Sequence, residues 1–211
     1  MSAPPIPVAP PSAAPVAASP DLPTLPIYRL SVAQYHAMIQ TGILTDDDPV
    51  ELIRGWLVPK MPKHPPHRVC TRKVRRNLER VLPSGWYAEA QELVTLTDSE
   101  PEPDVSVARE ELSEDVARNP EAADVALVVE VSDSTLARDR GNKKQLYAEA
   151  RIPVYWIVNL EDGQIEVYTN PSGPAPQPDY GSQQIFGPAD DVPVVIAGQE
   201  VARIPVRDLL P

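Results

Sequence analysis

The chain has 211 residues, of which 27 are proline and 42% are apolar, and its formal net charge is -11. This length suits one domain with an appendage and leaves no room for two large domains. No stretch approaches the roughly 18 uninterrupted apolar residues of a membrane-spanning helix, which excludes a span. The single cysteine, Cys70, excludes a disulfide framework and a cysteine-rich zinc site. The negative charge argues against nucleic-acid binding by the surface as a whole.

Residues 1–26 contain nine prolines among Ala, Ser and Val, and one charge, Asp21. Proline lacks a backbone donor and disfavours helix in the residue before it, so we expect a flexible tail, either a spacer or a proline-motif ligand. The segment lacks the basic start and the unbroken apolar stretch of a secretory signal, and we expect a cytoplasmic protein. A folded domain is predicted over residues 27–211.

The first predicted elements are a short helix and a pair of strands. Ser31 is a good N-cap for a helix that runs to Gln40, and Gly42 is placed to end it. Residues 50–58 predict two strands that bend at Gly55.

A basic helix is predicted next: its apolar row covers residues 67–82, Pro65 and Pro66 start it, and Pro83 and Gly85 end it. Its apolar positions recur at helical spacing: Cys70, Val74, Leu78 and Val81. Eight basic residues and one acid, Glu79, lie between Lys60 and Arg80. Such a segment on an acidic body indicates either a contact for an anion or a solvated helix face, with Arg68, Arg72, Arg75 and Arg76 as the candidate nucleic-acid-binding residues. His64 and His67 nearby are either functional or structural.

A run of strands with one helix follows. Strands are predicted at 86–97, 104–108, 125–131, 154–158 and 164–169, and a helix at 139–150. This order predicts an α/β fold with a mixed sheet and helices on its faces.

Glu130 is the most informative position, because it interrupts the apolar strand 125–131. A buried carboxylate without a partner costs several kcal/mol in order of magnitude. A basic partner, a shared proton or a metal ion must compensate for it, and a structural salt bridge is one such solution.

Asp104 and Lys143 are the other candidates. Asp104 opens a strand after Pro103, although Glu100 and Glu102 nearby also suit an acidic surface turn. Lys143 shares one helix face with Leu146, Tyr147 and Ala150 and therefore lies on the stripe that should face the sheet. Its ammonium either pairs with Asp139 one turn earlier or points to the carboxylates.

Two acids on neighbouring strands and a lysine on the next helix are typical of a Mg²⁺ or Mn²⁺ site that acts on phosphate. These hard cations are bound by one or two carboxylates and keep several waters. Such an ion polarises a phosphoryl group, and a lysine can stabilise the charge that develops on it.

These residues resemble known nuclease motifs. Pro103-Asp104 followed by Glu130-Val131-Ser132 resembles the PD-(D/E)XK signature of restriction-endonuclease-like nucleases. The stretch 128–158 more closely resembles the Uma family of bacterial endonucleases, the Uma two group. Three of its blocks occur in order: Ser132-x-Ser134-Thr135, Asp139-x-x-x-Lys143-x-x-x-Tyr147 and Pro153-x-Tyr155-Trp156. Glu51-Leu52-Ile53 with Gly55, and His67, extend the likeness, which spans about Ser31 to the C-terminus.

The resemblance implies a restriction-endonuclease-like core that hydrolyses phosphodiester bonds in nucleic acid, with DNA as the expected substrate. It implies a catalytic site of Glu51, Asp104, Glu130 and Lys143, in which the three acids hold Mg²⁺ or Mn²⁺. It also suggests a homodimer.

The chain departs from the family pattern at several positions. Ser132 stands where the signature usually has lysine, and its hydroxyl cannot supply a positive charge, so Lys143 is the expected substitute. The other departures are Asp133 for proline, Ala150-Arg151 for a glycine turn, Val154 for an acid and Asn159 for aspartate. None removes a proposed ligand, yet an inactive interaction or nucleic-acid-binding protein with the same fold stays the alternative.

Overall fold

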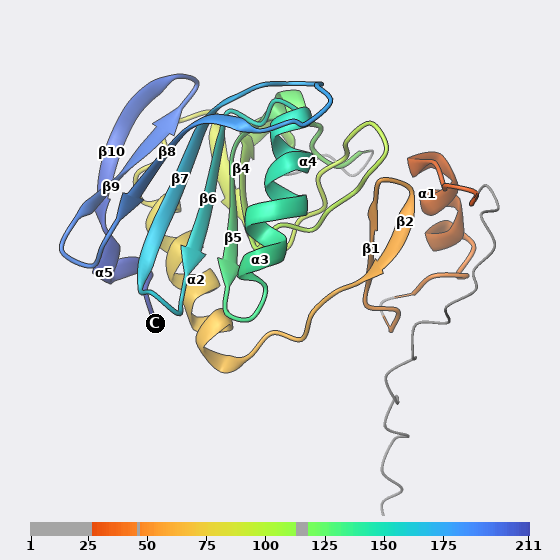
Figure 1. Ribbon diagram of the computed structural model, residues 1–211, viewed down its shortest axis with the longest axis horizontal. Helices are drawn as coiled ribbons and strands as arrows, with labels where there is room; N and C mark the ends of the chain where they lie inside the picture. Colours follow the sequence, from red (N-terminus) through yellow and green to blue (C-terminus); the bar gives the residue numbers. More distant parts are fainter. Residues whose placement is uncertain (1–26, 46, 113–117) are drawn as a thin grey trace, which may run out of the picture.

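The computed structural model describes residues 27–45, 47–112 and 118–211, so the predicted tail at 1–26 lies outside them. A six-stranded sheet in the order β3-β4-β5-β6-β7-β8 forms the centre of the molecule (Figure 1). Within it β5 and β6 are parallel, and the other neighbours are antiparallel. This mixed sheet with flanking helices confirms the predicted fold class. In the described part of the chain, no helix is both long and apolar enough to cross a membrane.

The strands of the sheet follow the chain in order. Their bounds are β3 (Trp86–Glu89), β4 (Val105–Arg109), β5 (Val125–Ser132), β6 (Val154–Asn159), β7 (Gln164–Pro171) and β8 (Tyr180–Phe186). All eight residues of β5 and all six of β6 are buried, as their apolar composition predicts for strands covered on both faces.

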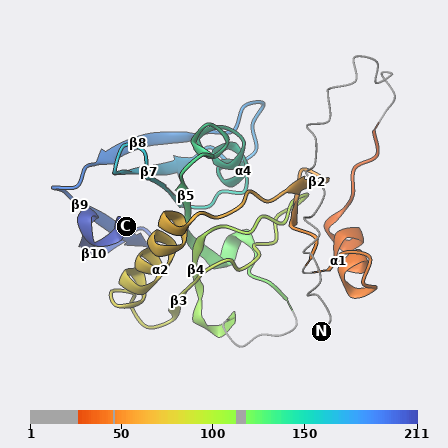
Figure 2. The same ribbon diagram turned by 90° about the horizontal axis from the view of Figure 1, so that it is seen from below.

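Two apolar layers cover the two faces of the sheet. Helix α2 (Pro65–Glu79), the hairpin β9–β10 (Asp191–Ile196 and Gln199–Pro205) and α5 (Val206–Leu209) lie on one face. Helix α4 (Lys144–Glu149) covers the other face, where Tyr147, Tyr155, Tyr168 and Tyr180 pack together. Figure 2 shows α2 and α4 on opposite sides of the sheet.

The N-terminal elements lie beside the sheet. Helix α1 (Val32–Gln40) begins with the capping box that Ser31 predicts, and β1 (Val50–Ile53) pairs with β2 (Trp56–Pro59). Gly55 joins these strands at φ 78°, where a Cβ would lie 2.6 Å from Cβ of Arg29. Leu52 forms a β-bridge to Glu100, which ties β1 to the loop before β4 and so places Glu51 near the sheet.

Three predicted elements need correction. The strand predicted at 86–97 ends at Glu89, because Gln91 at φ 62° leaves the extended conformation. The basic helix begins at Pro65, as the two prolines predict, but it ends at Glu79 and not at residue 82, since Pro83 disfavours helical backbone in the residue before it. The helix predicted at 139–150 starts earlier, with α3 (Leu136–Arg138), and then makes a π-helical turn at Asp139–Lys143 before α4.

Candidate active site

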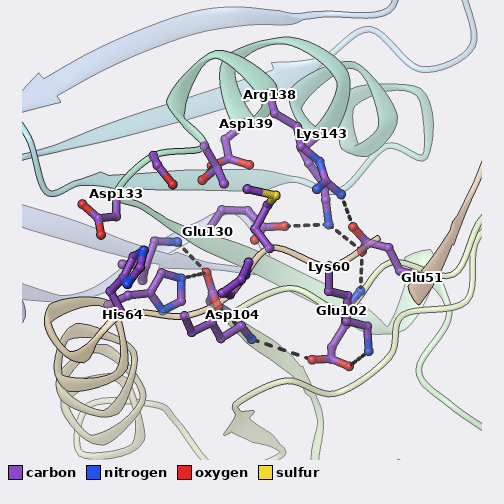
Figure 3. Close-up of a pocket in the computed structure, with 17 residues that line it drawn as sticks. Glu51, Lys60, His64, Glu102, Asp104, Glu130, Asp133, Arg138, Asp139 and Lys143 are labelled. Carbon is purple, nitrogen blue, oxygen red and sulfur yellow. Dashed lines mark hydrogen bonds and ion pairs between the residues drawn. The ribbon is translucent and has the colours of Figure 1, made fainter. Parts of the chain in front are cut away.

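One pocket brings together the four residues predicted from the sequence. Glu51 on β1, Asp104 before β4, Glu130 on β5 and Lys143 in the π-helical turn all line it (Figure 3). The segment 60–64 between β2 and α2 lines the same pocket. Residues far apart in the sequence therefore build one site where β4 begins and β5 ends, on inner strands of the sheet.

The two strands place Asp104 and Glu130 by their register. Val105 pairs with Val129, so Asp104 lies next to the end of β5, where the Val131 amide donates to its Oδ2 at 2.8 Å. Along β5 the side chains of Val129 and Val131 enter the α2 layer, and alternation directs Glu130 to the side of α4.

Lys143 is buried and contacts two carboxylates. Its Nζ lies 2.9 Å from Oε2 of Glu51 and 3.3 Å from Oε1 of Glu130. Burial disfavours the ammonium, but the charges of these two acids outweigh it and raise the pKa of Lys143. Of the two interpretations of Lys143, the contacts support the ammonium directed at the carboxylates.

Asp139, the other candidate partner of Lys143, is bonded to hydroxyls. Its Oδ2 accepts from Oγ of Ser132 at 2.5 Å and from Oγ1 of Thr135 at 2.6 Å. Burial raises the pKa of Asp139, although these two hydrogen bonds and Lys143 oppose the rise. Ser132, where the usual signature has lysine, thus holds Asp139, a further acid of the pocket.

Glu51 is surrounded by positive groups and a backbone donor. Arg138 Nη2 bonds to its Oε1, while Lys143 and the Glu102 amide (3.2 Å) bond to its Oε2. Both oxygens are therefore engaged, so Glu51 serves in this arrangement as the counterion of Lys143 and Arg138.

Asp104 is held from α2 and from the segment that precedes it. His67 Nε2 lies 3.0 Å from its Oδ2 and Lys63 Nζ lies 3.3 Å from its Oδ1. Burial alone would raise the pKa of Asp104, but His67, Lys63 and the Val131 amide lower it overall. His67 is itself buried, whereas His64 lines the pocket and is exposed.

The charge of Glu130 is only partly compensated. Its Oε1 accepts from the Tyr147 hydroxyl at 2.7 Å and faces Lys143. Burial raises the pKa of Glu130 to about 8; Asp104 and Asp139 add to the rise, and Lys143 and Tyr147 oppose it. A further positive charge beside Glu130 would stabilise its ionised form.

The donor set of the pocket suits a hard divalent cation. Asp104 and Glu130 supply carboxylate oxygens, and Mg²⁺ needs one or two such ligands because it keeps several waters. Among the described residues, no three His, Cys, Asp or Glu side chains converge as a ready-made metal-binding group. The residues thus fit an ion held by two carboxylates and water better than one enclosed by protein ligands.

The basic helix α2 extends from this pocket. A second hollow adjoins the first, and Lys63 and His67 line both; Arg68, Arg72 and Gln91 also line the second. Arg68, Arg72 and Arg76 are exposed, while Arg75 pairs with Glu79 and Glu89, both at 2.9 Å. Three of the four predicted arginines therefore present their charge to solvent.

Comparison with known proteins shows the family of this chain. A family model described as "Uma2: Putative restriction endonuclease" matches residues 32–205. The chain belongs to the Uma2 family.

A solved structure also matches this Uma2 chain. It is a crystal structure of "a putative nuclease belonging to DUF820 from Anabaena variabilis ATCC 29413", with 16% sequence identity and a TM-score of 0.60. The match covers 80% of this chain and 94% of that chain, and at this identity it establishes the fold alone. A search of curated proteins gave no match.

Sequence reasoning missed several polar side chains of this Uma2 site. Tyr147 was assigned to the apolar stripe of its helix, yet its hydroxyl bonds to Glu130. A buried tyrosine hydroxyl usually needs a partner, and that was the available signal. Arg138 and Lys63 gave no such signal, because their partners Glu51 and Asp104 are remote in the sequence.

The raised pKa of Glu130 predicts a pH-dependent effect of Glu130→Gln on stability. An ordinary glutamate titrates near pH 4.3 in unfolded chains. A carboxyl whose pKa is raised on folding stabilises the folded state fully only at low pH, where it is protonated in both states. This contribution to stability decreases as pH rises above the unfolded pKa and is lost once pH has passed the folded pKa of about 8. In metal-free buffer, Glu130→Gln should therefore gain about 1 kcal/mol or more in unfolding free energy relative to the wild type between pH 5 and 8.

Urea unfolding at several pH values measures this change. Glu161→Gln, on an exposed turn, is the control and should show a constant difference from the wild type. A constant difference for Glu130→Gln as well would contradict the raised pKa.

Proposed function

We propose that this chain is a metal-dependent endonuclease that hydrolyses phosphodiester bonds in nucleic acid, with DNA as the expected substrate and the cytoplasm as the expected location. One observation carries the proposal: in a member of the Uma2 family, a buried lysine contacts Glu51 and Glu130 in the same pocket as Asp104. Buried charges of both signs are costly to assemble, and a purely structural core would be about as stable with apolar residues.

Asp104 and Glu130 would hold Mg²⁺ or Mn²⁺. When bound, the ion would polarise the scissile phosphate and lower the pKa of a water. Glu51, predicted as a third ligand, would act through Lys143 while its two oxygens stay engaged. The predicted homodimer stays an expectation from the family resemblance.

The surrounding side chains have separate tasks in this proposal. His67 would orient Asp104, and the Tyr147 hydroxyl would orient Glu130. Lys143 would stabilise the negative charge that develops on phosphate oxygens as water attacks phosphorus and the bond to the leaving oxygen breaks. Each residue acts from a fixed position, so little reorganisation is needed.

The second candidate function is an inactive nuclease-fold protein that binds nucleic acid or another partner. It is favoured by the existing ion pairs, since Glu51 is neutralised by Arg138 and Lys143, and Asp104 faces Lys63 and His67. Metal binding separates the two candidates, because a scaffold has no need of a cation at Glu130.

A metal-dependent cleavage assay tests the proposal directly. Labelled duplex DNA, single-stranded DNA and RNA are incubated with the protein in Mg²⁺, Mn²⁺ or EDTA, and Mn²⁺ binding is measured by calorimetry. We expect cleavage that EDTA abolishes, and Glu130→Gln should weaken both Mn²⁺ binding and cleavage. Absence of both cleavage and Mn²⁺ binding in the wild-type protein would favour the scaffold.

Lys143→Met should lower the single-turnover cleavage rate about 100-fold or more, by analogy with loss of one donor to a developing oxyanion. Metal affinity should not fall, because lysine is not a ligand. The control is Lys144→Met: Lys144 is the next residue, and its Nζ pairs with Asp179 at 2.9 Å outside the pocket. The proposal for Lys143 fails if Lys144 proves important while Lys143 does not.

The exposed arginines of α2 should contact backbone phosphates. Each neutralised phosphate contributes about 0.9 to the slope of log K against log salt on duplex DNA. Replacing Arg72 and Arg76 together by Gln should therefore flatten the slope by roughly one to two units. Arg75 should contribute less, because it already pairs with Glu79 and Glu89.

Fluorescence anisotropy over a salt series gives these slopes. Arg203→Gln is the control, because Arg203 lies on β10 and pairs with Glu200. An unchanged slope in the double variant would assign the arginines to a solvated face.

A further inference from the structure

The helix that carries Lys143 contains one π-helical turn. In this turn, Asp139–Lys143, the Lys144 amide donates to the Asp139 carbonyl five residues earlier. Such turns are rare and occur often at functional sites. Here the turn lies directly beside the carboxylates of the pocket, since Asp139 and Lys143 both line it.

The π-helical turn aligns four side chains that are spaced by four residues. Thr135, Asp139, Lys143 and Tyr147 all bond to groups within the site. In a regular helix of 3.6 residues per turn, side chains four residues apart differ in direction around the helix axis by about 40°. The side chains of Thr135 and Tyr147, three such steps apart, would therefore differ by about 120°. A π-helical turn has more residues per turn, so it rotates less per residue and reduces this difference in direction. The turn therefore lets Lys143 and Tyr147 face the same acids as Asp139.

Contacts from the sheet hold this turn. Arg140, inside the turn, directs its Nε to both oxygens of Glu166 on β7, at 3.1 and 3.0 Å. Glu166 is fully buried and also accepts from the Tyr168 hydroxyl at 2.6 Å. The Tyr155 hydroxyl on β6 donates to the Asp139 carbonyl at 3.2 Å. The turn is thus fastened to two neighbouring strands.

The Arg140–Glu166 pair has features of a positioning device. Only the Glu166 side of the pair is buried, so loss of Arg140 would leave a buried carboxylate without its cation. The side chain of Arg140 is 43% exposed and runs to β7, while Asp139 and Lys143 of the same turn line the pocket. Arg140 therefore influences the site through the backbone that carries Asp139 and Lys143.

We propose that Arg140 is a positioning residue: its pairing with the buried Glu166 fixes the π-helical turn on the sheet and thereby sets where the Lys143 ammonium lies. This inference rests on the proposed nuclease function for its activity measurement. Its structural part, the fastening of the turn, stands on the contacts alone.

The experiment compares Arg140→Met, Arg140→Lys and the double variant Arg140→Met/Glu166→Gln, which leaves no unpaired buried charge. Lys144→Met is the matched control, because it breaks an ion pair of the same helix outside the turn. Steady-state cleavage with Mg²⁺ gives kcat and KM, hydrogen exchange followed by mass spectrometry reports on residues 139–147, and thermal melting reports on the whole fold.

We expect Arg140→Met and the double variant to lower kcat tenfold or more with KM changed less than twofold, and to speed exchange at 139–147 selectively. Arg140→Lys should retain part of the wild-type kcat and part of the slow exchange at 139–147. Lys144→Met should match the wild type in both measurements. Wild-type kcat in both Met variants would overturn the inference, as would a loss of kcat that only follows a general fall in melting temperature. If the wild-type protein does not cleave, the proposed function fails instead; selective exchange then still supports the positioning role and unchanged exchange overturns it.

Discussion

The contact between the buried Glu130 carboxylate and the Lys143 ammonium is the interaction on which the rest of the site depends. Glu130 occupies an otherwise apolar strand at the centre of the sheet, where an uncompensated charge would be costly. Two side chains of the same helix contact Glu130: the Lys143 ammonium at 3.3 Å and the Tyr147 hydroxyl at 2.7 Å. The compensation is incomplete: burial first, and then the negative charges of Asp104 and Asp139, raise the pKa of Glu130 to about 8. An incompletely neutralised acidic pocket is the electrostatic condition for recruiting a cation.

The fold delivers the remaining groups from separate segments. The N-terminal hairpin β1–β2 is not part of the central sheet, yet it brings Glu51 to Lys143 at 2.9 Å. Helix α2 has two roles: its buried side supplies His67 to Asp104, while its exposed side carries Arg68, Arg72 and Arg76. Any ligand held by these arginines would lie against the same helix whose His67 contacts Asp104, a proposed metal ligand. The proposed binding surface and the proposed metal site are thus structurally continuous.

Two of the departures from the family pattern, Ser132 and Asn159, bond to polar neighbours. Ser132 cannot supply the charge of a lysine, but its hydroxyl holds Asp139 at 2.5 Å, while the charge comes from Lys143 on the helix. Asn159, which replaces an aspartate, donates to Asp162 at 2.8 Å and lies 3.4 Å from Glu166. Ser132 and Asn159 therefore make polar contacts around the helix and the sheet, and the acids of the pocket are retained.

The sequence by itself determined which side chains face inward. Apolar alternation and helical spacing are local properties, so they identified β5 with its buried acid, the inward position of Lys143, the capped helix α1 and the basic helix α2. Only the tertiary structure decided which charges meet. Glu51 precedes Lys143 by 92 residues and Arg138 by 87, and no local pattern specifies contacts at such separations. The π-helical turn likewise depends on Glu166 and Tyr155, because strand residues that pack across the sheet, and not helix propensity, provide the bonds that hold it.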